Sequence, residues 1–455
     1  MSGTLSSLNT ALSALRYNQV AMDVASGNIA NSATPGYARR SVVGQTTGAP
    51  AVPAIWSRWD GAGSGVQAGP VTRMVDPLLD ARARTEHARS SFLDARATSL
   101  ARVETAIGEP GDGGVAAALT AFQQAWHDVS NNPGDSSART QLLSRAESLR
   151  SAIAAQATSV STEWSDQRTR LDSQAAEVTA VAGQLADLNR GLRTAYVGQT
   201  DAGNLLDQRD QLTLRLAELT GAQVTIKEDS TADVTLNGQS LVSGYTAATV
   251  AGTGSADLAG AASNPVGITV NGVPVSVTAG ELGGTVSLLR GDLPDYAARL
   301  DSFVSEMVTS VNTQHAAGVD LAGATGGTFF TGTGALTLQV ALTDPRKVAA
   351  AAAGVGGLDN TNATALATMD LGASSYRNLV TSFGVSVAST NTASTSQATL
   401  TSQVDASREA VAGVNVDEEM VALMAAQRGY EGAARVLTTM DSVLDTLINR
   451  TGLVH

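Results

Sequence analysis

Two apolar stripes with the same heptad spacing lie near the two ends of this 455-residue chain. Near the N-terminus, one 3-4-3-4 spacing joins Leu5, Leu8, Leu12, Leu15, Met22 and Ile29, with Gln19 and Ser26 at the two remaining seam positions. Near the C-terminus, the same spacing joins Val416, Met420, Leu423, Tyr430, Leu437, Leu444 and Ile448. Such a spacing is typical of a coiled-coil seam, which needs a second helix to cover it. We therefore expect two terminal helices that pair with each other or with neighbouring copies, and these residues are the candidate assembly interface.

Local signals predict where the terminal helices end. The first stripe stops before Thr34-Pro35-Gly36, where proline disfavours helix at the preceding residue and Pro-Gly suits a type II turn. Asn415 fits the N-cap of the last helix, with Glu418 as its capping-box partner. The acidic run 417–419 then complements the helix dipole, and we interpret it as a helix start and not as a paired-carboxylate site.

Long helices are predicted between the ends. Asp76-Pro77 begins a helix that stops at Gly108, and a second one carries Leu119 to Val129. Residues 136–196 contain no proline and a single glycine, so they can form one rod of roughly 90 Å. Further helices are expected at about 205–219, 282–317 with a kink at Pro294, and 374–412.

The middle of the chain has the pattern of short β-strands and not of long helices. Strands are predicted at 223–226, 234–236 and 268–270, and the Asn-Gly pairs at 237 and 271 are strong hairpin signals. A short β region is expected around 329–342. The fold class is thus mainly α with an inserted β domain. We expect an N-terminal axial segment 1–75 paired with a C-terminal axial helix 413–455, a helical central domain of 76–220 and 280–412, and a small β-rich outer domain 221–279.

Charge and composition exclude several functions. The formal net charge of −13 argues against nucleic acid and anionic membranes as partners. The chain has no cysteine, which removes disulfides, thiolate metal sites and cysteine nucleophiles. The four histidines, His87, His127, His315 and His455, are not paired at metal-ligand spacing. We therefore predict no catalytic residue, no metal and no cofactor.

No stretch reads as a membrane span, because Asn264, Pro265 and Pro274 interrupt the longest uncharged segment. The N-terminus also lacks the features of a secretory signal, since no continuous apolar run follows Met1. Taken alone, these features predict a cytoplasmic protein or one exported without a cleaved signal peptide.

Several motifs resemble those of flagellar axial proteins. The N-terminal run that includes Asn28, Asn31 and Pro35-Gly36-Tyr37 is similar to the signature shared by rod, hook and hook-associated proteins. The stretch Asn204 to Leu212, with Asp207, Arg209 and Asp210, resembles the most characteristic internal motif of the hook–filament junction family. The stretches 65–78, 280–330 and 413–448 resemble that family as well, so the resemblance runs from end to end.

The resemblance implies a structural subunit that assembles at the hook tip and joins hook to filament. Members of that family are exported through the flagellum's own type III apparatus and act outside the cell. The implied partners are further copies of the chain in a ring, hook protein below and the second hook-associated protein above. A filament cap protein and an export chaperone are expected as transient partners.

Two alternatives stay open at this stage. One is a different flagellar axial protein, either the second junction protein or flagellin, which the 204–212 motif and the 318–330 run disfavour. The other is an enzyme such as a flagellum-associated wall hydrolase. A hydrolase needs a groove with paired carboxylates or a metal cluster, and the sequence shows no sign of either.

Overall fold

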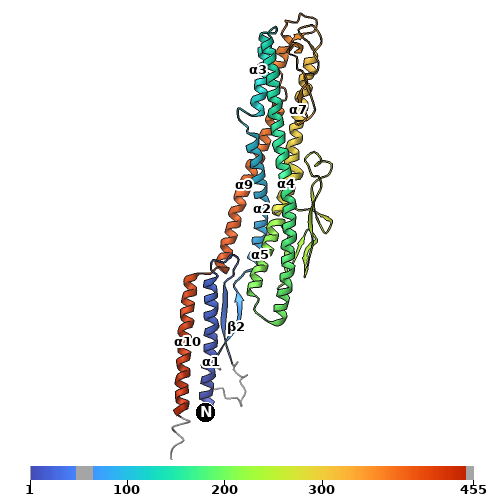
Figure 1. Ribbon diagram of the computed structural model, residues 1–455. Coiled ribbons are helices and arrows are strands. Elements are labelled where there is room, and N and C mark those ends of the chain that lie inside the picture. The colour runs from blue at the N-terminus through green and yellow to red at the C-terminus, as the bar shows by residue number, and fades with distance from the viewer. Residues whose placement is uncertain (1, 48–64, 447–455) are drawn as a thin grey trace, which may run out of the picture.

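A single helix of 63 residues, α4 (Ser136–Gly198), forms the spine of the molecule. At 1.5 Å per residue it is about 95 Å long, as the sequence predicts for its proline-free stretch. The computed structural model describes residues 2–47 and 65–446. Figure 1 shows an elongated body of helices around α4, with a separate pair of terminal helices at one end. The predicted fold class, mainly α with an inserted β domain, is confirmed.

The body helices begin and end at the residues that local chemistry favours. Asp76 caps α2 by accepting from the Leu78 amide at 2.8 Å, and Gly108 ends it in a left-handed conformation, which glycine adopts without a Cβ penalty. Asp135 caps α4 in the same way. The other helices of the body are α2 (Pro77–Ile107), α3 (Val115–Asn131), α5 (Gly203–Thr220), α6 (Gly280–Ser287), α7 (Leu293–Ala316), α8 (Thr361–Thr368) and α9 (Ala373–Ala412).

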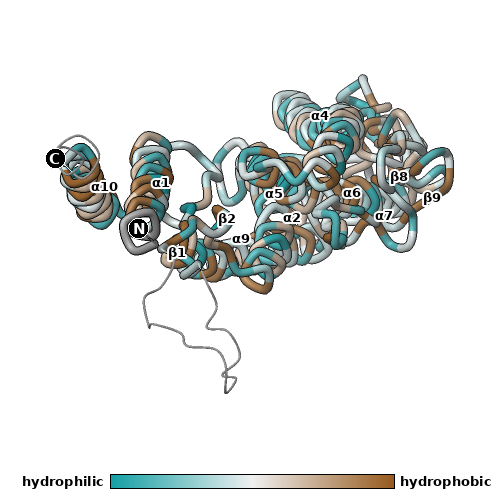
Figure 2. The backbone as a smooth tube through the Cα atoms, turned by 90° about the horizontal axis from the view of Figure 1, so that it is seen from below, coloured by the Kyte–Doolittle hydropathy of each residue, from teal (hydrophilic) through white to brown (hydrophobic). Residues whose placement is uncertain are grey.

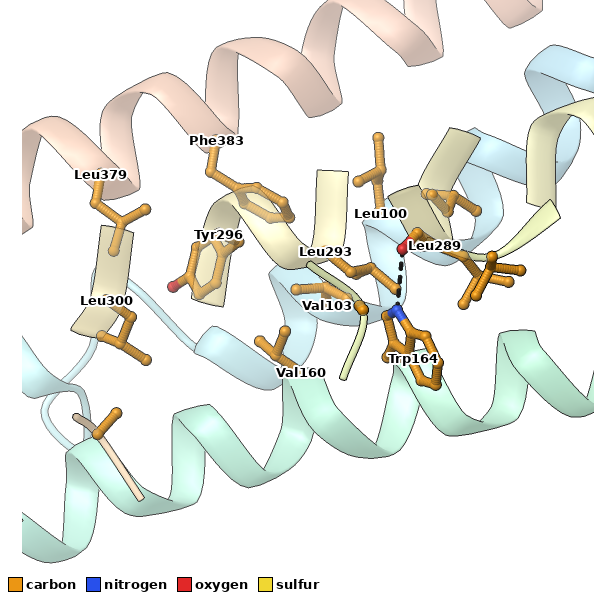
Figure 3. Packing of buried hydrophobic residues seen from close by; sticks show 14 of the residues in the cluster. Leu100, Val103, Val160, Trp164, Leu289, Leu293, Tyr296, Leu300, Leu379 and Phe383 are labelled. Atoms are coloured by element: carbon orange, nitrogen blue, oxygen red, sulfur yellow. Dashed lines mark hydrogen bonds between the residues drawn. The ribbon is translucent and has the colours of Figure 1, made fainter. Parts of the chain in front are cut away.

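One apolar core fills the centre of the body. Trp164 of α4 is fully buried among Leu100, Val103 and Leu293, which come from α2 and α7 (Figure 3). Its Nε1 donates to the carbonyl of Leu289 at 3.0 Å, so the indole has both its apolar contacts and its hydrogen bond.

The predicted distortion near Pro294 lies one turn earlier than expected. Residues Leu288–Asp292 form a π-helical turn between α6 and α7, and Pro294 then sits in the first turn of α7. Proline has no N–H and its ring excludes the carbonyl four residues before it, which is compatible with a widened turn at this point.

Aromatic side chains fill the end of the body far from the terminal helices. Phe122 and Trp126 of α3 pack against Phe329 and Phe330, with ring centroids 5.7–5.8 Å apart. Short strand pairs close this end. They are β10 (Gly318–Val319) with β13 (Ala351–Ala352), and β11 (Phe330–Thr331) with β12 (Gln339–Val340); a 3₁₀ turn, Pro345–Lys347, lies between them.

The β insertion lies against the side of α4 as two small antiparallel sheets. Asn237 and Gly238, and likewise Asn271 and Gly272, have positive φ values in their hairpin turns, which confirms the turns predicted from the sequence. One sheet has the order β3 (Gln223–Ile226), β4 (Ala232–Leu236), β5 (Gln239–Ser243) and β6 (Thr246–Ala247). The other has β7 (Val250–Thr253), β8 (Gly267–Val270) and β9 (Val273–Val275).

The terminal helices form the second part of the molecule. α1 (Ser2–Ala30) and α10 (Val416–Asp445) run antiparallel beside each other, next to the hairpin of β1 (Arg40–Thr46) and β2 (Val66–Arg73). Seen from below, α10, α1 and the hairpin stand in a row that leads away from the body (Figure 2). Within the described residues no helix is both long and apolar enough to cross a membrane.

Candidate assembly site on the terminal helices

Small side chains line the contact between the two terminal helices. Ala11 and Ala25 of α1 and Ala426 and Ala433 of α10 are buried. A Cβ added at Gly429 would lie 2.5 Å from the side chain of Asn18, so glycine is what lets α1 approach α10 here. The helix α10 continues through Gly429.

The predicted assembly residues lie beside this alanine seam. Leu8, Leu15, Met22 and Ile29 on α1, and Leu423, Leu437 and Leu444 on α10, are half-buried. Leu12 is 41% exposed and Met420 is 50% exposed, and Val416 and Tyr430 are exposed as well. The side chain of Leu5 and the whole of Ile448 lie outside the described part of the chain. The helix pair therefore leaves much of its large apolar surface uncovered.

The two flanks of the helix pair differ. On the flank near β1, a groove of about 500 Å³ is lined by Ala21 and Val24 of α1 and by Ala422 and Ala425 of α10. With 3.6 residues per turn, the exposed Leu12, Val416 and Met420 point away from that groove. These three side chains thus share the opposite flank, whereas the exposed Val421 and Val436 of α10 lie on the groove side.

The side chain of Asn28 connects α1 to the β1–β2 hairpin and to α10. It is fully buried, and all its hydrogen-bonding capacity is used. Its Nδ2 donates to the carbonyl of Arg40 at 2.8 Å and to Oε2 of Glu419 at 2.9 Å. Its Oδ1 accepts from the hydroxyl of Tyr37 at 2.8 Å and from the amide of Arg40 at 3.0 Å. One asparagine therefore joins α1, the hairpin and α10.

Arg39 completes this contact with α10. Its Nε donates to Oε1 of the buried Glu419 at 2.7 Å, and its amide donates to the carbonyl of Ala412 at 2.8 Å. Asn415 caps α10 as predicted, but Glu418 accepts from the Asn415 side chain and from Arg39, and not from the Asn415 amide. The acidic run therefore does more than start a helix, because Glu419 is part of a tertiary contact that local sequence reasoning missed.

The rest of the N-terminal motif shapes the turn after α1. Thr34 and Tyr37 close the turn with a hydrogen bond of 3.2 Å, and Gly36 has the positive φ that the predicted type II turn needs. Asn31 donates to the carbonyl of Gly27 at 2.9 Å. The carbonyl of Pro35 accepts from Gln211 of α5, so the turn also touches the body. Burial raises the pKa of the Tyr37 phenol above its usual range.

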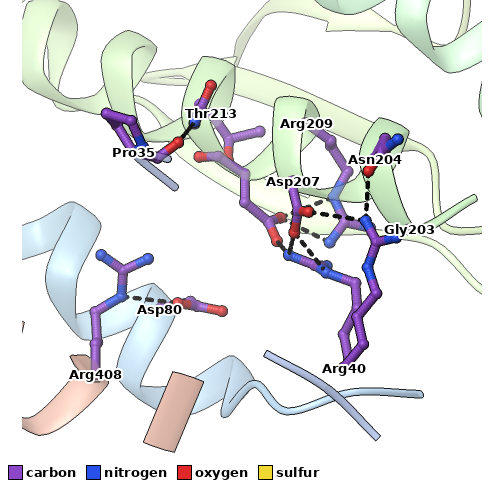
Figure 4. A network of polar contacts seen from close by, with 12 residues as sticks. Pro35, Arg40, Asp80, Gly203, Asn204, Asp207, Arg209, Thr213 and Arg408 are labelled. Atoms are coloured by element: carbon purple, nitrogen blue, oxygen red, sulfur yellow. Dashed lines mark hydrogen bonds and ion pairs between the residues drawn. The ribbon is translucent and has the colours of Figure 1, made fainter. Parts of the chain in front are cut away.

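Carboxylates on α5 bind arginines from the hairpin (Figure 4). Arg73 donates to Asp207 and to Asp210, both at 2.8 Å, and Arg40 lies 3.3 Å from Asp207. The guanidinium of Arg209 forms an ion pair with Asp210 at 2.7 Å. All these side chains are largely buried. The partners Arg40 and Arg73 are not on that helix, so spacing along α5 could not have indicated them. They are paired opposite each other in the β1–β2 ladder.

The terminal helices and the hairpin thus offer ion pairs and apolar contacts. The histidine and acidic side chains considered as catalytic or metal-binding candidates have structural roles as well. In the described part of the chain, no group of three histidine or acidic side chains could hold a metal ion. His315 is buried, with Nδ1 2.6 Å from the Gly327 carbonyl and Nε2 accepting from the Ala349 amide at 2.9 Å. Because Nε2 accepts from an amide, the ring is neutral, and burial lowers its pKa.

Comparisons with known proteins agree with this geometry. The profile of the flagellar hook-associated protein FlgK helical domain matches residues 100–330. Profiles of flagella basal body rod proteins match both ends: 8–37 for the N-terminal one and 401–450 for the FlgEFG C-terminal one. Flagellar hook-associated protein 1 of Bacillus subtilis is 26% identical, with 100% of this chain and 99% of that protein covered. The Escherichia coli protein of the same name is 25% identical over 97% and 99%.

A solved structure has the same fold. The flagellar hook junction protein FlgK from Burkholderia pseudomallei covers 74% of this chain and 100% of its own, with a TM-score of 0.65 and 17% identity. The paired terminal helices below a helical body define a flagellar axial protein. Among these, the chain belongs to the FlgK family of flagellar hook-associated proteins, structural components of the flagellum at the hook–filament junction. The resemblance inferred from the motifs is confirmed.

Proposed function

We propose that copies of this chain assemble side by side into a ring through the flank of the α1–α10 pair opposite the hairpin. The observation that carries the proposal is the exposure of Leu12, Val416, Met420 and Tyr430 on that flank. Complete burial of a fully exposed large apolar side chain contributes about 1.5–3 kcal/mol, and an isolated subunit forgoes part of this contribution at each of these half-exposed positions. We assign the half-buried members of both stripes to the same interface.

The proposed ring sits between hook protein below and the second hook-associated protein above. A filament cap protein and an export chaperone are proposed as transient partners. We infer that the chain acts outside the cell, after export through the flagellum, with α1 retained. Ala11 and Asn18 support this, because both lie where α1 meets α10.

We also propose a structural and not an enzymatic role for the acidic side chains. Glu419, Asp207 and Asp210 are each engaged by an arginine at 2.7–2.8 Å in the joint between the terminal helices and the body. Carboxylates held in this way orient helices. For the chain as a whole we propose the division 1–75 with 413–455 as the axial unit, 76–220 with 280–412 as the helical domain and 221–279 as the outer β domain.

A pair of matched variants tests the interface. Met420→Asp places a charge on the proposed contact, and Val273→Asp places one at a similarly exposed position, 45% against 50%, on β9 of the outer domain. Both purified variants are expected to melt like the wild type. Cells that carry only Met420→Asp should have hooks without attached filaments in electron micrographs, whereas Val273→Asp should restore filaments. Filaments joined normally in Met420→Asp cells would contradict the proposal.

A further inference from the structure

The contact between α9 and α2 changes in chemistry along its length. In the upper half of α9, Leu379, Phe383 and Val387 are buried in the apolar core (Figure 3). In the lower half, Gln397 donates to Oε2 of Glu86 at 2.7 Å, and Thr401 donates to the Glu86 carbonyl at 3.3 Å. The half of α9 that leads to the terminal helices thus combines polar contacts to α2 with one buried apolar side chain, Val404.

His87 of α2 stands at the lower end of this polar contact. Its Nε2 lies 3.0 Å from both carboxylate oxygens of Asp405 on α9, and its Nδ1 lies 3.2 Å from Oε1 of Glu218 on α5. A neutral imidazole carries one N–H and can donate to only one of these carboxylates. The imidazolium donates to both. The arrangement is therefore complete only when His87 is protonated.

Among the positively charged partners of Asp405, His87 makes the shortest contact in the described part of the chain. Arg408 is engaged by Asp80 at 2.9 Å and lies 3.9 Å from Asp405, whereas Arg215 reaches Glu218 at 3.2 Å. The contact with Glu218, together with that of Asp405, raises the pKa of His87 against the effect of burial. Charged groups around this cluster are Asp80, Arg84 and Glu86 on α2, Arg209, Asp210, Arg215 and Glu218 on α5, and Asp405 and Arg408 on α9. Arg215 is also contacted by Glu177 of α4 and Glu281 of α6.

We propose that His87 is a proton-operated clasp that fastens the lower half of α9 to α2 and α5. The clasp has a consequence for the terminal helices because α9 ends only three residues before the Asn415 cap of α10. The Ala412 carbonyl, at the end of α9, also accepts from the Arg39 amide. Deprotonation of His87 therefore loosens the place from which α10 starts. This inference stands apart from the proposed ring and requires only a folded subunit.

The direction of the pH effect follows from the raised pKa of His87. A group that binds its proton more tightly in the folded state stabilises that state below the unfolded pKa of about 6.5. The stabilisation is lost as the pH rises through the folded pKa. The clasp is therefore closed below pH 6.5 and opens as the pH rises through the raised pKa of His87.

Hydrogen exchange on the full-length chain tests the clasp. After correction for the intrinsic pH dependence, protection of the amides at 398–412 should fall between pH 6 and pH 9, by up to tenfold for each unit by which the pKa is raised. Amides at 376–390, in the apolar half of α9, are the internal control and should not change. In His87→Gln, protection at 398–412 should be low at both pH values. The exposed His127→Gln on α3 should behave as the wild type.

A second measurement keeps the test independent of any folding defect in the variants. In the wild type, the imidazole resonance that is missing from the His87→Gln spectrum should titrate above pH 6.5. Titration at or below 6.5, or equal protection of 398–412 at pH 6 and pH 9, would overturn the proposal. A His87→Gln protein that shows the same pH-dependent fall as the wild type would overturn it as well.

Discussion

The helical body and the terminal pair are built from different kinds of side chain. In the body, the buried set includes Trp126, Trp164 and a cluster of phenylalanines, so this region completes an apolar core within one chain. In the terminal pair, the buried side chains are mostly alanines, joined by Asn28 and Glu419. Its large apolar residues lie toward the surface. A region that buries its alanines and leaves its leucines half-buried or exposed has apolar surface left for a neighbour, which fits the proposed assembly through this pair.

The largest effect on the free energy of unfolding is expected in the body. Trp164→Ala removes a fully buried indole and its hydrogen bond to Leu289, at a cost of about 3–5 kcal/mol. Urea unfolding followed by circular dichroism measures the loss. Met424→Ala on α10 is the control, because that side chain is 46% exposed and its truncation should cost less than about 0.5 kcal/mol. Similar losses in the free energy of unfolding for the two variants would contradict the proposed difference between the body and the terminal pair.

The next effect concerns the buried carboxylate that ties the terminal pair together. Glu419→Gln removes the charge that Arg39 contacts at 2.7 Å, and a hydrogen bond to a charged group contributes about 1.5–3 kcal/mol. The loss should be local, so exchange of α10 amides should accelerate while the α4 amides keep their protection. Glu431→Gln, an exposed position on the same helix, serves as the control. Equal exchange of α10 in both variants would mean that the contact does not hold the helix.

A smaller effect is expected at the start of α10. The Asn415 side chain accepts from the Asp417 amide at 3.1 Å, and replacing such a cap with alanine costs about 1 kcal/mol. Asn415→Ala should fray the first turn of α10, which exchange of the amides at 417–419 would reveal. Asp76→Ala at the cap of α2 is a matched change in the body, where packing holds the helix. Fraying there should be weaker, and the reverse order would contradict the comparison.

The smallest effect on the isolated subunit is expected for Leu444→Asp. Leu444 is half-buried at the far end of α10, so the melting temperature of the body should stay unchanged. Assembly should fail, because a charge at the proposed interface is desolvated without a partner. Motility of the cells is the readout, and Ser442→Asp, exposed on the same turn, is the control that should keep it. A large fall in melting temperature would place Leu444 in the core of the monomer.

Local sequence signals were sufficient for most of the elements. Asp76 and Gly108 mark the ends of α2, the proline-free stretch gives α4, and the Asn-Gly turns give the hairpins, because each of these depends on residues a few positions apart. The position of the helical distortion was wrong by one turn. Pro294 excludes a regular hydrogen bond, but where the helix widens also depends on packing, including the bond from Trp164 to Leu289.

The sequence by itself therefore determined the helices, the β insertion, the family motifs and which residues share a helix face. The tertiary structure alone decided which face meets which neighbour. Both faces of α1 carry apolar residues, and only the burial of Ala11, Ala25, Ala426 and Ala433 shows that alanines lie at the centre of the contact with α10. Asn28, Asp207 and His87 each have a partner more than a hundred residues away, namely Glu419, Arg73 and Asp405. Periodicity and capping act within a few turns of one helix, whereas these contacts exist only after the chain has folded.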